Sequence, residues 1–143
     1  MMSKKTSSRC ICMPMVADLF HSGHVNFLKK AKERINNTYL IIGLFNDEQA
    51  NTYKRIPIIS FENRKKVLES CKYVDEIIKV PLKLDKKFID ENNIDYIYHA
   101  HYENETSKYN NFYNNDIDKD KIIRLDYTSG ISTTEIIKSI KTK

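Results

Sequence analysis

The sequence predicts an α/β domain with a five-stranded parallel sheet and helices on both faces. Short apolar runs alternate with amphipathic stretches along most of the 143 residues. Repeated strand-then-helix order of this kind is typical of parallel sheets whose faces are covered by helices. One run, residues 39–45, is apolar throughout, as expected for a strand that is buried on both faces.

The first strand and the first helix are predicted at residues 9–16 and 23–35. The strand contains a mostly apolar run, in which Cys10 and Cys12 would lie on the same face and suit core packing. In the second segment, apolar residues recur at helical spacing and would form one face of a helix. These residues are Val25, Leu28, Ala31 and Ile35.

The middle of the chain predicts two more strands with a helix between them. Residues 39–45 are expected to form the second strand, and the polar residues 46–57 are expected to form a loop. Ser60 is expected to cap a helix that runs to residue 68. Residues 76–80 then read as a short third strand.

The last part of the chain completes the alternation. A short helix is predicted at residues 85–91, a fourth strand at 94–99, a fifth strand at 121–125 and a closing helix at 133–140. Residues 104–120 are rich in Asn, Asp and Tyr and predict no definite element, although a short helix around 107–113 is compatible with them.

Composition describes one ordinary globular domain, with 41% hydrophobic and 30% charged residues. We expect residues 1–8 to form a flexible tail and residues 9–143 to form the domain. There is no membrane-spanning run, no visible secretory signal and no disulfide framework among the three cysteines, so we expect a cytoplasmic protein with free thiols. The net charge of +5 comes from scattered lysines without a nucleic-acid-binding signature, so we expect no nucleic-acid partner.

Two stretches predict sites for phosphate. His21 and His24 follow the first strand at the start of a helix, where unpaired N–H groups and a partial positive charge favour anions. Gly23 between them allows close approach of backbone and ligand. Ser132, three residues before Glu135, predicts a capping box whose spare hydroxyl groups could also serve an anion. The simpler roles for the histidine pair are helix capping, packing or metal binding, but no further metal ligands lie nearby in the sequence.

Four stretches, in this order, resemble motifs of the HxGH nucleotidyltransferase superfamily. They are closest to its cytidylyltransferase family, which includes choline-phosphate, glycerol-3-phosphate and phosphonate cytidylyltransferases. The stretches are residues 18–24, Tyr53-Lys54 with Arg64, residues 73–76, and residues 130–134. The resemblance extends over residues 9–140 and implies a Rossmann-like fold, a catalytic domain at 9–143 and CTP as the nucleotide.

The resemblance also implies a role for each matched residue. Catalysis would fall to His21, His24 and Lys54. CTP binding would involve Val16, Ala17, Asp18, Gly23, Arg64, His99, Gly130, Ile131, Ser132, Thr133 and Thr134. Asp18 would hold a metal ion, with Mg²⁺ as the expected cofactor, or orient neighbouring groups. The resemblance further implies a homodimer that uses a small phosphorylated or phosphonate acceptor.

Two departures from the family pattern concern charged residues. Tyr127 and Ser129 replace the arginine and glutamate of the family's RTEGISTT motif, and Arg124 is a candidate substitute for that arginine. After His99, residues 100–101 replace an acidic pair that is usual in the family.

A third departure lies in residues 15–17, where the family has a glycine-aromatic pattern. Residues 15–18, 51–57 and 127–130 together resemble cytidylyltransferase domains found with phosphoenolpyruvate mutase, which implies that the acceptor is a small phosphonate. A choline acceptor would instead favour an aromatic cage around its quaternary ammonium group. Tyr102, Tyr109 and Tyr113 are candidates for such a cage. Two alternatives stay open: an adenylyltransferase that uses ATP, and a nucleotide-binding regulatory protein without turnover.

Overall fold

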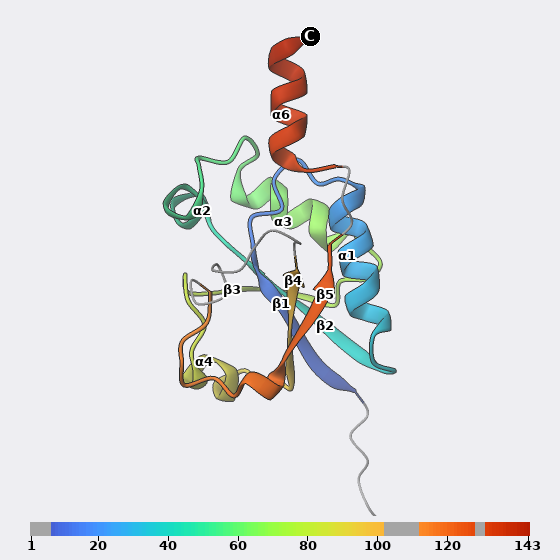
Figure 1. Ribbon diagram of the computed structural model, residues 1–143, viewed down its shortest axis with the longest axis vertical. Coiled ribbons are helices and arrows are strands. Elements are labelled where there is room, and N and C mark those ends of the chain that lie inside the picture. Colours follow the sequence, from blue (N-terminus) through green and yellow to red (C-terminus); the bar gives the residue numbers. More distant parts are fainter. Residues whose placement is uncertain (1–6, 102–111, 128–130) are drawn as a thin grey trace, which may run out of the picture.

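All five strands of the computed structural model lie parallel in one sheet, ordered β3-β2-β1-β4-β5 (Figure 1). The structure describes residues 7–101, 112–127 and 131–143. The strands are β1 (Ser8–Met15), β2 (Thr38–Leu44), β3 (Glu76–Lys79), β4 (Tyr96–His101) and β5 (Ile122–Asp126). The helices are α1 (Ser22–Glu33), α2 (Asp47–Tyr53), α3 (Phe61–Glu69), α4 (Lys86–Glu91) and α6 (Thr133–Thr142), with a 3₁₀ turn η1 (Lys119–Lys121). The predicted fold class is confirmed.

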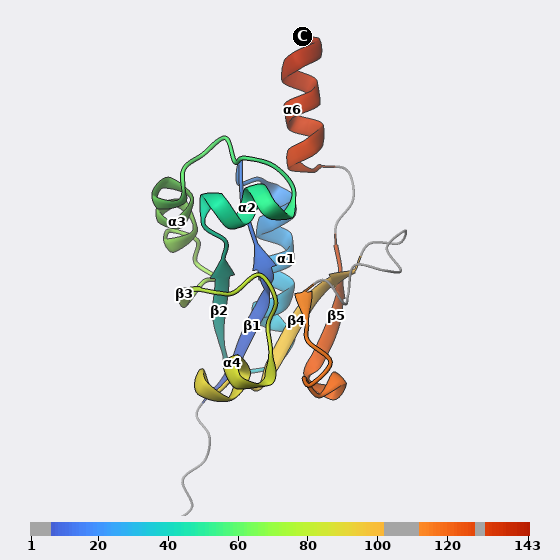
Figure 2. The same cartoon turned by 90° about the vertical axis from the view of Figure 1, so that its left-hand side faces the viewer.

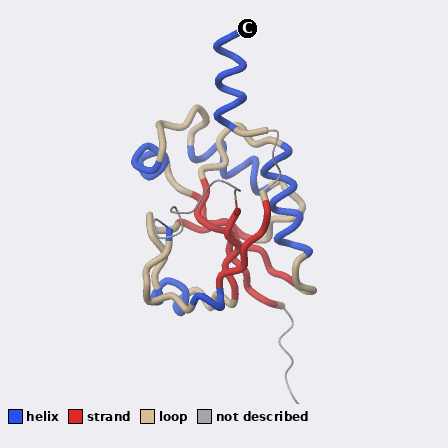
Figure 3. Tube along the Cα trace, viewed as in Figure 1, coloured by secondary structure: helices blue, strands red, loops and turns tan. Residues whose placement is uncertain are grey.

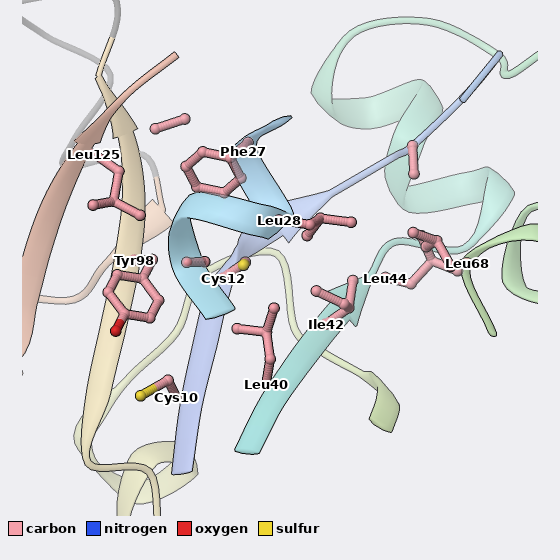
Figure 4. Close-up of a cluster of buried hydrophobic side chains, with 13 residues drawn as sticks. Cys10, Cys12, Phe27, Leu28, Leu40, Ile42, Leu44, Leu68, Tyr98 and Leu125 are labelled. Carbon is pink, nitrogen blue, oxygen red and sulfur yellow. The ribbon is translucent and has the colours of Figure 1, made fainter. Parts of the chain in front are cut away.

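The predicted strands and helices are all present, with ends shifted by at most two residues. Helices cover both faces of the sheet, as expected (Figure 3). On one face, α1 packs over Cys10 and Cys12, which do share a face of β1, and Leu68 of α3 lies beside Leu44 of β2 (Figure 4). On the other face, Ile89 of α4 packs with Phe112 and nearby residues against the opposite side of the same strands.

The prediction of a loop over residues 46–57 was wrong for its first half, which forms helix α2. Asn46 Oδ1 accepts a hydrogen bond from Gln49 N–H, and Gln49 Oε1 accepts one from Asn46 N–H, so the two residues form a capping box. The Gln49 side-chain amide also donates to the Val80 carbonyl at 2.7 Å. Only Ala50 of this helix is buried, so the segment lacks the apolar stripe by which sequence analysis detects helices.

Ser60 occupies the predicted N-cap position of α3, but its side chain makes no cap hydrogen bond. Its hydroxyl accepts a hydrogen bond from the Asn63 side-chain amide instead. In the next connection, Asp75 accepts a hydrogen bond from Leu40 N–H at 2.7 Å and pairs with Lys32. These contacts join α1, β2 and the approach to β3.

Helix α6 projects from the carboxyl edge of the sheet (Figures 1 and 2). None of its residues is buried, and Ile140 is 66% exposed. The helix is therefore held mainly at its first turn, beside the ends of the central strands. Within the ranges given above, no helix is both long and apolar enough to cross a membrane.

Candidate active site

A cavity lies at the carboxyl ends of β1, the central strand of the sheet, and its neighbour β4. The chain reverses its direction of progress across the sheet at this point, since β2 lies on one side of β1 and β4 on the other. Ligands of open parallel sheets bind at such switch points. The lining residues are Met13, Pro14, Met15, Val16, Ala17, Asp18, His21, His24, Phe27, Tyr53, Lys54, Arg55, Pro57, Ala100, Tyr127, Ser132, Thr133 and Thr134.

His21 and His24 lie together at the first turn of α1, with ring centroids 3.9 Å apart. His21 is the N-cap residue, and its Nδ1 accepts a hydrogen bond from Gly23 N–H at 3.0 Å. His24 Nδ1 accepts one from His21 N–H at 3.1 Å. A main-chain N–H can only donate, so Nδ1 of each ring carries no proton. The proton of each neutral imidazole is therefore on Nε2, and both rings offer an N–H donor at the cavity.

The surroundings of the two rings favour their neutral form. Burial lowers the pKa of His21. Burial, followed by repulsion from His21, lowers the pKa of His24 to about 3. Near neutral pH the pair thus consists of two uncharged hydrogen-bond donors at the positive end of a helix. Such a site suits an anion whose charge grows during a reaction.

Gly23 leaves room for two neighbouring side chains. A Cβ atom at this position would lie 2.6 Å from the Tyr127 hydroxyl and 2.8 Å from His21 Cε1. Both distances are shorter than van der Waals contact. The absence of a side chain at Gly23 therefore allows Tyr127 and His21 to approach each other beside the cavity.

Asp18 anchors the segment that follows α2. Its two carboxylate oxygens accept hydrogen bonds from Ile58 N–H at 2.8 Å and Ile59 N–H at 2.9 Å. The residue is only 4% exposed, and the residues on either side, Ala17 and Leu19, have positive φ angles of 54° and 51°. Of the two roles expected for Asp18, the structure supports the orientation of neighbouring groups. The expected metal contact of Asp18 stays a prediction, because each oxygen accepts one hydrogen bond and keeps a further lone pair.

Lys54 and Arg55 line the cavity from the segment anchored by Asp18. Lys54 ends α2 as its C-cap residue, and its N–H donates to the Ala50 carbonyl at 2.9 Å. Arg55 Nη1 donates to Thr134 Oγ1 at 3.4 Å. Two cationic side chains, adjacent in sequence, therefore face the same cavity as the two imidazoles.

The first turn of α6 forms the far wall of the cavity. Ser132 Oγ accepts a hydrogen bond from Glu135 N–H at 3.1 Å, which confirms the Ser132 half of the predicted capping box. Thr133 Oγ1 donates to the Asp18 carbonyl at 2.8 Å, so Asp18 holds both this turn and the Lys54 segment. Ile131 is half-buried but lies outside the lining, and Gly130 lies outside the described residues.

Arg64 does not occupy the predicted phosphate-binding position. Its side chain is fully buried, and Nε and Nη1 donate to the carbonyls of Ile59, Val16 and Phe45 at 2.6–2.9 Å. Nη2 donates to Asp47 at 2.7 Å. Because protein oxygens already occupy these donors, Arg64 holds together the segments that surround the cavity rather than lining it.

His99 is also displaced from the predicted site. Alternate residues of a strand face opposite sides of the sheet, and it is Ala100, not His99, that lines the cavity. His99 Nδ1 shares a hydrogen bond with the Tyr113 hydroxyl at 2.8 Å in a buried position. Arg124, the candidate substitute for the missing motif arginine, is exposed on β5 and is not part of the lining.

The sequence analysis missed Arg55, Tyr127 and the apolar floor of the cavity. Met13 and Phe27 belong to that floor, which continues into the hydrophobic core. A signal for Arg55 existed, since it directly follows Lys54 in a polar segment. No group of three or more His, Cys, Asp or Glu side chains arranged for a metal ion occurs among the described residues.

Comparison with known proteins agrees with this geometry. A family model described as cytidylyltransferase-like matches residues 16–139. The chain is 33% identical over 126 residues to choline-phosphate cytidylyltransferase A of Mus musculus, a match that covers 87% of this chain and 34% of the mouse protein. It is 36% identical over 128 residues to choline-phosphate cytidylyltransferase 2 of Arabidopsis thaliana, again over 87% of this chain but 42% of the plant protein.

A solved structure shares the fold. It is the lipopolysaccharide core biosynthesis protein of Thermoplasma volcanium GSS1, with a TM-score of 0.64 and 22% sequence identity. The match covers 85% of this chain and 98% of the other. In contrast, the chain spans well under half the length of the two curated relatives that it matches.

Proposed function

This chain belongs to the cytidylyltransferase-like family, and we propose that it transfers CMP from CTP to a small phosphorylated alcohol or a phosphonate. The observation that carries the proposal is the pair of Nδ1-accepting imidazoles, His21 and His24, at the N-terminus of α1. They share one cavity with Lys54 and with the first turn of α6. Two helix N-termini, two neutral N–H donors and a lysine form a site suited to a phosphate chain.

In the proposed reaction, an oxygen of the acceptor phosphate or phosphonate attacks the α-phosphorus of CTP. A new P–O bond forms, the bond between the α-phosphorus and the oxygen bridging to the β-phosphate breaks, and pyrophosphate leaves with that electron pair. The protein contributes positioning and charge stabilisation. His21 and His24 donate Nε2–H to phosphoryl oxygens as negative charge develops on them, and Lys54 supplies a positive charge.

CTP is preferred to ATP because the family model and both curated relatives are named for cytidylyl transfer. The acceptor is the less defined substrate. Both relatives are named for choline phosphate, whereas the resemblance of residues 15–17 and their neighbours favours a small phosphonate. Both classes present the same nucleophile, a negatively charged oxygen on phosphorus.

We propose Mg²⁺ as an ion that is bound by the triphosphate of CTP. Magnesium sites use one or two carboxylates together with substrate phosphates and water. Asp18 is the one carboxylate among the described lining residues, and both its oxygens accept main-chain hydrogen bonds. The one carboxylate lies within the number that such sites use, so Asp18 would be the side chain that holds the ion, and the reaction above involves no step through it.

We also propose that the protein acts as a cytoplasmic homodimer without a nucleic-acid partner. Support for a second copy comes from large apolar side chains that stay exposed near and along α6, including Ile56 at 71%, Ile58 at 58% and Ile140 at 66%. Support for a reducing compartment comes from the thiols of Cys10, Cys12 and Cys71, none of which is joined in a disulfide. Light scattering coupled to size exclusion measures the oligomeric state directly.

The test of the proposed function is pyrophosphate release with CTP or ATP against a panel of choline phosphate, glycerol 3-phosphate and small phosphonates. His21→Asn and His24→Asn are the informative variants. Asparagine Oδ1 can replace Nδ1 as the acceptor of the main-chain hydrogen bond, while the Nε2–H donor is lost. We expect each variant to keep its melting temperature and to lose about a hundredfold or more in turnover.

Ser22→Ala is the matched control, because Ser22 lies between the two histidines yet is exposed and outside the lining. It should turn over CTP at close to the wild-type rate. Near-normal turnover in a well-folded histidine variant would remove the catalytic assignment. Turnover with ATP alone would overturn the choice of nucleotide, and nucleotide binding without turnover would favour a regulatory protein.

A further inference from the structure

We propose that Arg55 binds the phosphate chain of the nucleotide and bridges it to the first turn of α6. The proposal deepens the proposed function, since it assigns a contact within the same site. Of the five arginines of the chain, all of which lie within the described residues, only Arg55 lines the cavity. The sequence analysis assigned no role to this residue, although it directly follows Lys54.

The positions of the other four arginines leave this role to Arg55. Arg9 lies at the opposite edge of the sheet, where Nε donates to the Asn92 carbonyl. Arg64 is buried and donates to protein oxygens. Arg34 follows the C-terminus of α1, and Arg124 is exposed on β5. None of these four guanidinium groups lines the cavity.

The contact that Arg55 makes now is one that a phosphate could readily replace. Arg55 Nη1 lies 3.4 Å from Thr134 Oγ1, beyond the usual range of an N–H···O hydrogen bond. The acceptor is a neutral hydroxyl, whereas hydrogen bonds from arginine to phosphate are charge-assisted, shorter and often bidentate. A phosphate oxygen between Arg55 and the α6 N-terminus would therefore improve the hydrogen bonding of both.

The distribution of charge in the cavity also favours a contact between Arg55 and the phosphates. A nucleoside triphosphate carries several negative charges, and both imidazoles near the α1 N-terminus are held neutral. Asp18, the one carboxylate among the described lining residues, is already stabilised by two main-chain N–H groups. Lys54 and Arg55 are thus the two cationic side chains that the described lining offers to the phosphates.

Arg55 and Lys54 are expected to act differently although they are neighbours. The link from Arg55 to Thr134 joins residues 79 positions apart, so Arg55 spans the cavity between two segments that Asp18 already holds. Because the Arg55 guanidinium lies beside the N-terminus of α6 before any reaction begins, it should contribute to nucleotide binding in the ground state. Its loss should raise KM for CTP and weaken CTP binding more than it lowers kcat.

The experiment compares Arg55→Gln, Arg55→Lys and the wild-type chain by calorimetric titration with CTP and with inorganic tripolyphosphate, alongside pyrophosphate-release kinetics. Arg34→Gln is the matched control, since it removes the same charge outside the cavity. We expect Arg55→Gln to weaken both ligands equally, by about tenfold to a hundredfold. Arg55→Lys should be intermediate, and Arg34→Gln should bind within about twofold of wild type.

Equal losses for CTP and tripolyphosphate identify a contact to the phosphates, which a merely structural role would not single out. Wild-type binding in Arg55→Gln, or a loss for CTP but not for tripolyphosphate, would overturn the inference while leaving cytidylyl transfer intact. If the wild-type chain binds tripolyphosphate through Arg55 but does not turn over CTP, the proposed function fails and the inference holds. If it binds neither ligand, both fail.

Discussion

At the scale of single residues, main-chain N–H groups decide what His21 and His24 can do. Each ring accepts a hydrogen bond at Nδ1 from the first turn of α1, so the same contact that caps the helix places the remaining proton on Nε2. Capping and catalysis are therefore compatible roles of one pair. Neutral donors interact moderately with a bound phosphate, and their hydrogen bonds strengthen as charge accumulates on the transferring group.

Lys54→Met should separate chemistry from binding. Methionine keeps much of the length of the lysine side chain but removes its charge from the cavity. If Lys54 acts mainly in the transition state, kcat should fall on the order of a hundredfold while the Kd for CTP changes severalfold at most. Pyrophosphate-release kinetics and calorimetric titration of the same preparation measure the two quantities.

The control for this variant is Lys66→Met, which removes a lysine from the exposed side of α3. Its kinetics should match those of the wild type. A Lys54→Met enzyme that loses CTP affinity yet turns over normally at saturation would make Lys54 a ground-state anchor. Unchanged kinetics and binding in that variant would give Lys54 no role in the reaction.

Sequence reasoning named the histidine pair from the strand-turn-helix order after β1 and Lys54 from the resemblance of its stretch to a family motif, and all three residues line the cavity. It misplaced Arg64 and His99. Whether a side chain of a helix or strand faces a cavity or a core depends on how neighbouring elements pack. Arg64 is captured by carbonyls of three other segments, and this capture is not visible in its own sequence neighbourhood.

At the scale of elements, the turn after β1 organises the site. The side chain of Asp18 accepts hydrogen bonds from the main-chain N–H groups of residues 58 and 59, and its carbonyl accepts one from the Thr133 hydroxyl. One residue thereby positions the segment that carries Lys54 and Arg55 and the first turn of α6. The positive φ angles of Ala17 and Leu19 show that the turn is tightly constrained.

Asp18→Asn should loosen the segment that carries Lys54 and Arg55, while a side chain of nearly the same size still lines the cavity. The amide keeps one acceptor oxygen, but its NH₂ group would face a main-chain N–H, so one partly buried donor loses its partner. We expect a loss of about 1–3 kcal/mol in stability and faster hydrogen exchange at Ile58 and Ile59. Turnover should fall because Lys54 and Arg55 lose their fixed position.

Asp95→Asn provides the comparison, because Asp95 also accepts a main-chain hydrogen bond, from Arg9 N–H, but at the amino-terminal edge of the sheet. It should lose stability while keeping its turnover at temperatures where it is folded. If Asp18→Asn exchanges and turns over like the wild type, Asp18 does not organise the site. Mass spectrometry of hydrogen exchange in peptides covering residues 54–60 makes the measurement.

Helix α2 shows what pattern reading misses at this scale. Its residues are almost all polar, so apolar periodicity cannot reveal it. Its capping box uses Asn46 and Gln49 in place of the more familiar Ser or Thr with Glu. The strands, in contrast, were predicted closely because each contains a short apolar run, which in β2 reflects burial along almost the whole strand.

At the scale of the whole molecule, the histidine pair should make stability depend on pH. The pKa of His24 is lowered to about 3 in the folded chain, whereas an unfolded histidine titrates near 6.5. Between these values the unfolded chain binds more protons, so the free energy of unfolding falls as the pH is lowered through this window. The slope approaches about 1.4 kcal/mol per pH unit for each such group.

Urea unfolding at a series of pH values from about 7.5 to about 5 measures this slope around the histidine pKa. His24→Asn keeps an acceptor for His21 N–H but cannot be protonated, so its profile should be flatter over the same range. The pKa of His21 is lowered as well, and a smaller dependence should persist. Identical profiles for wild type and variant would show that His24 is not held neutral.

The parallel sheet and its helical layers were predictable as a whole, because alternation of strand and helix restricts the topology strongly. The packing of α6, in contrast, was not predictable from the sequence. Its sequence has a regular apolar side and predicts a packed helix, yet none of its residues is buried in this chain. What covers such a side is decided by surroundings that a single amphipathic pattern does not specify.

The cavity has a consequence for the order of folding events. Its walls come from residues 13–27, 53–57, 100, 127 and 132–134, so its closure requires contacts between segments more than a hundred positions apart. Loop-closure entropy makes such contacts late and slow compared with the formation of α1 on β1 and β2. A partly folded chain would then have formed much of its hydrophobic core before the cavity is complete. Recovery of nucleotide binding during refolding should therefore lag behind the recovery of helical signal.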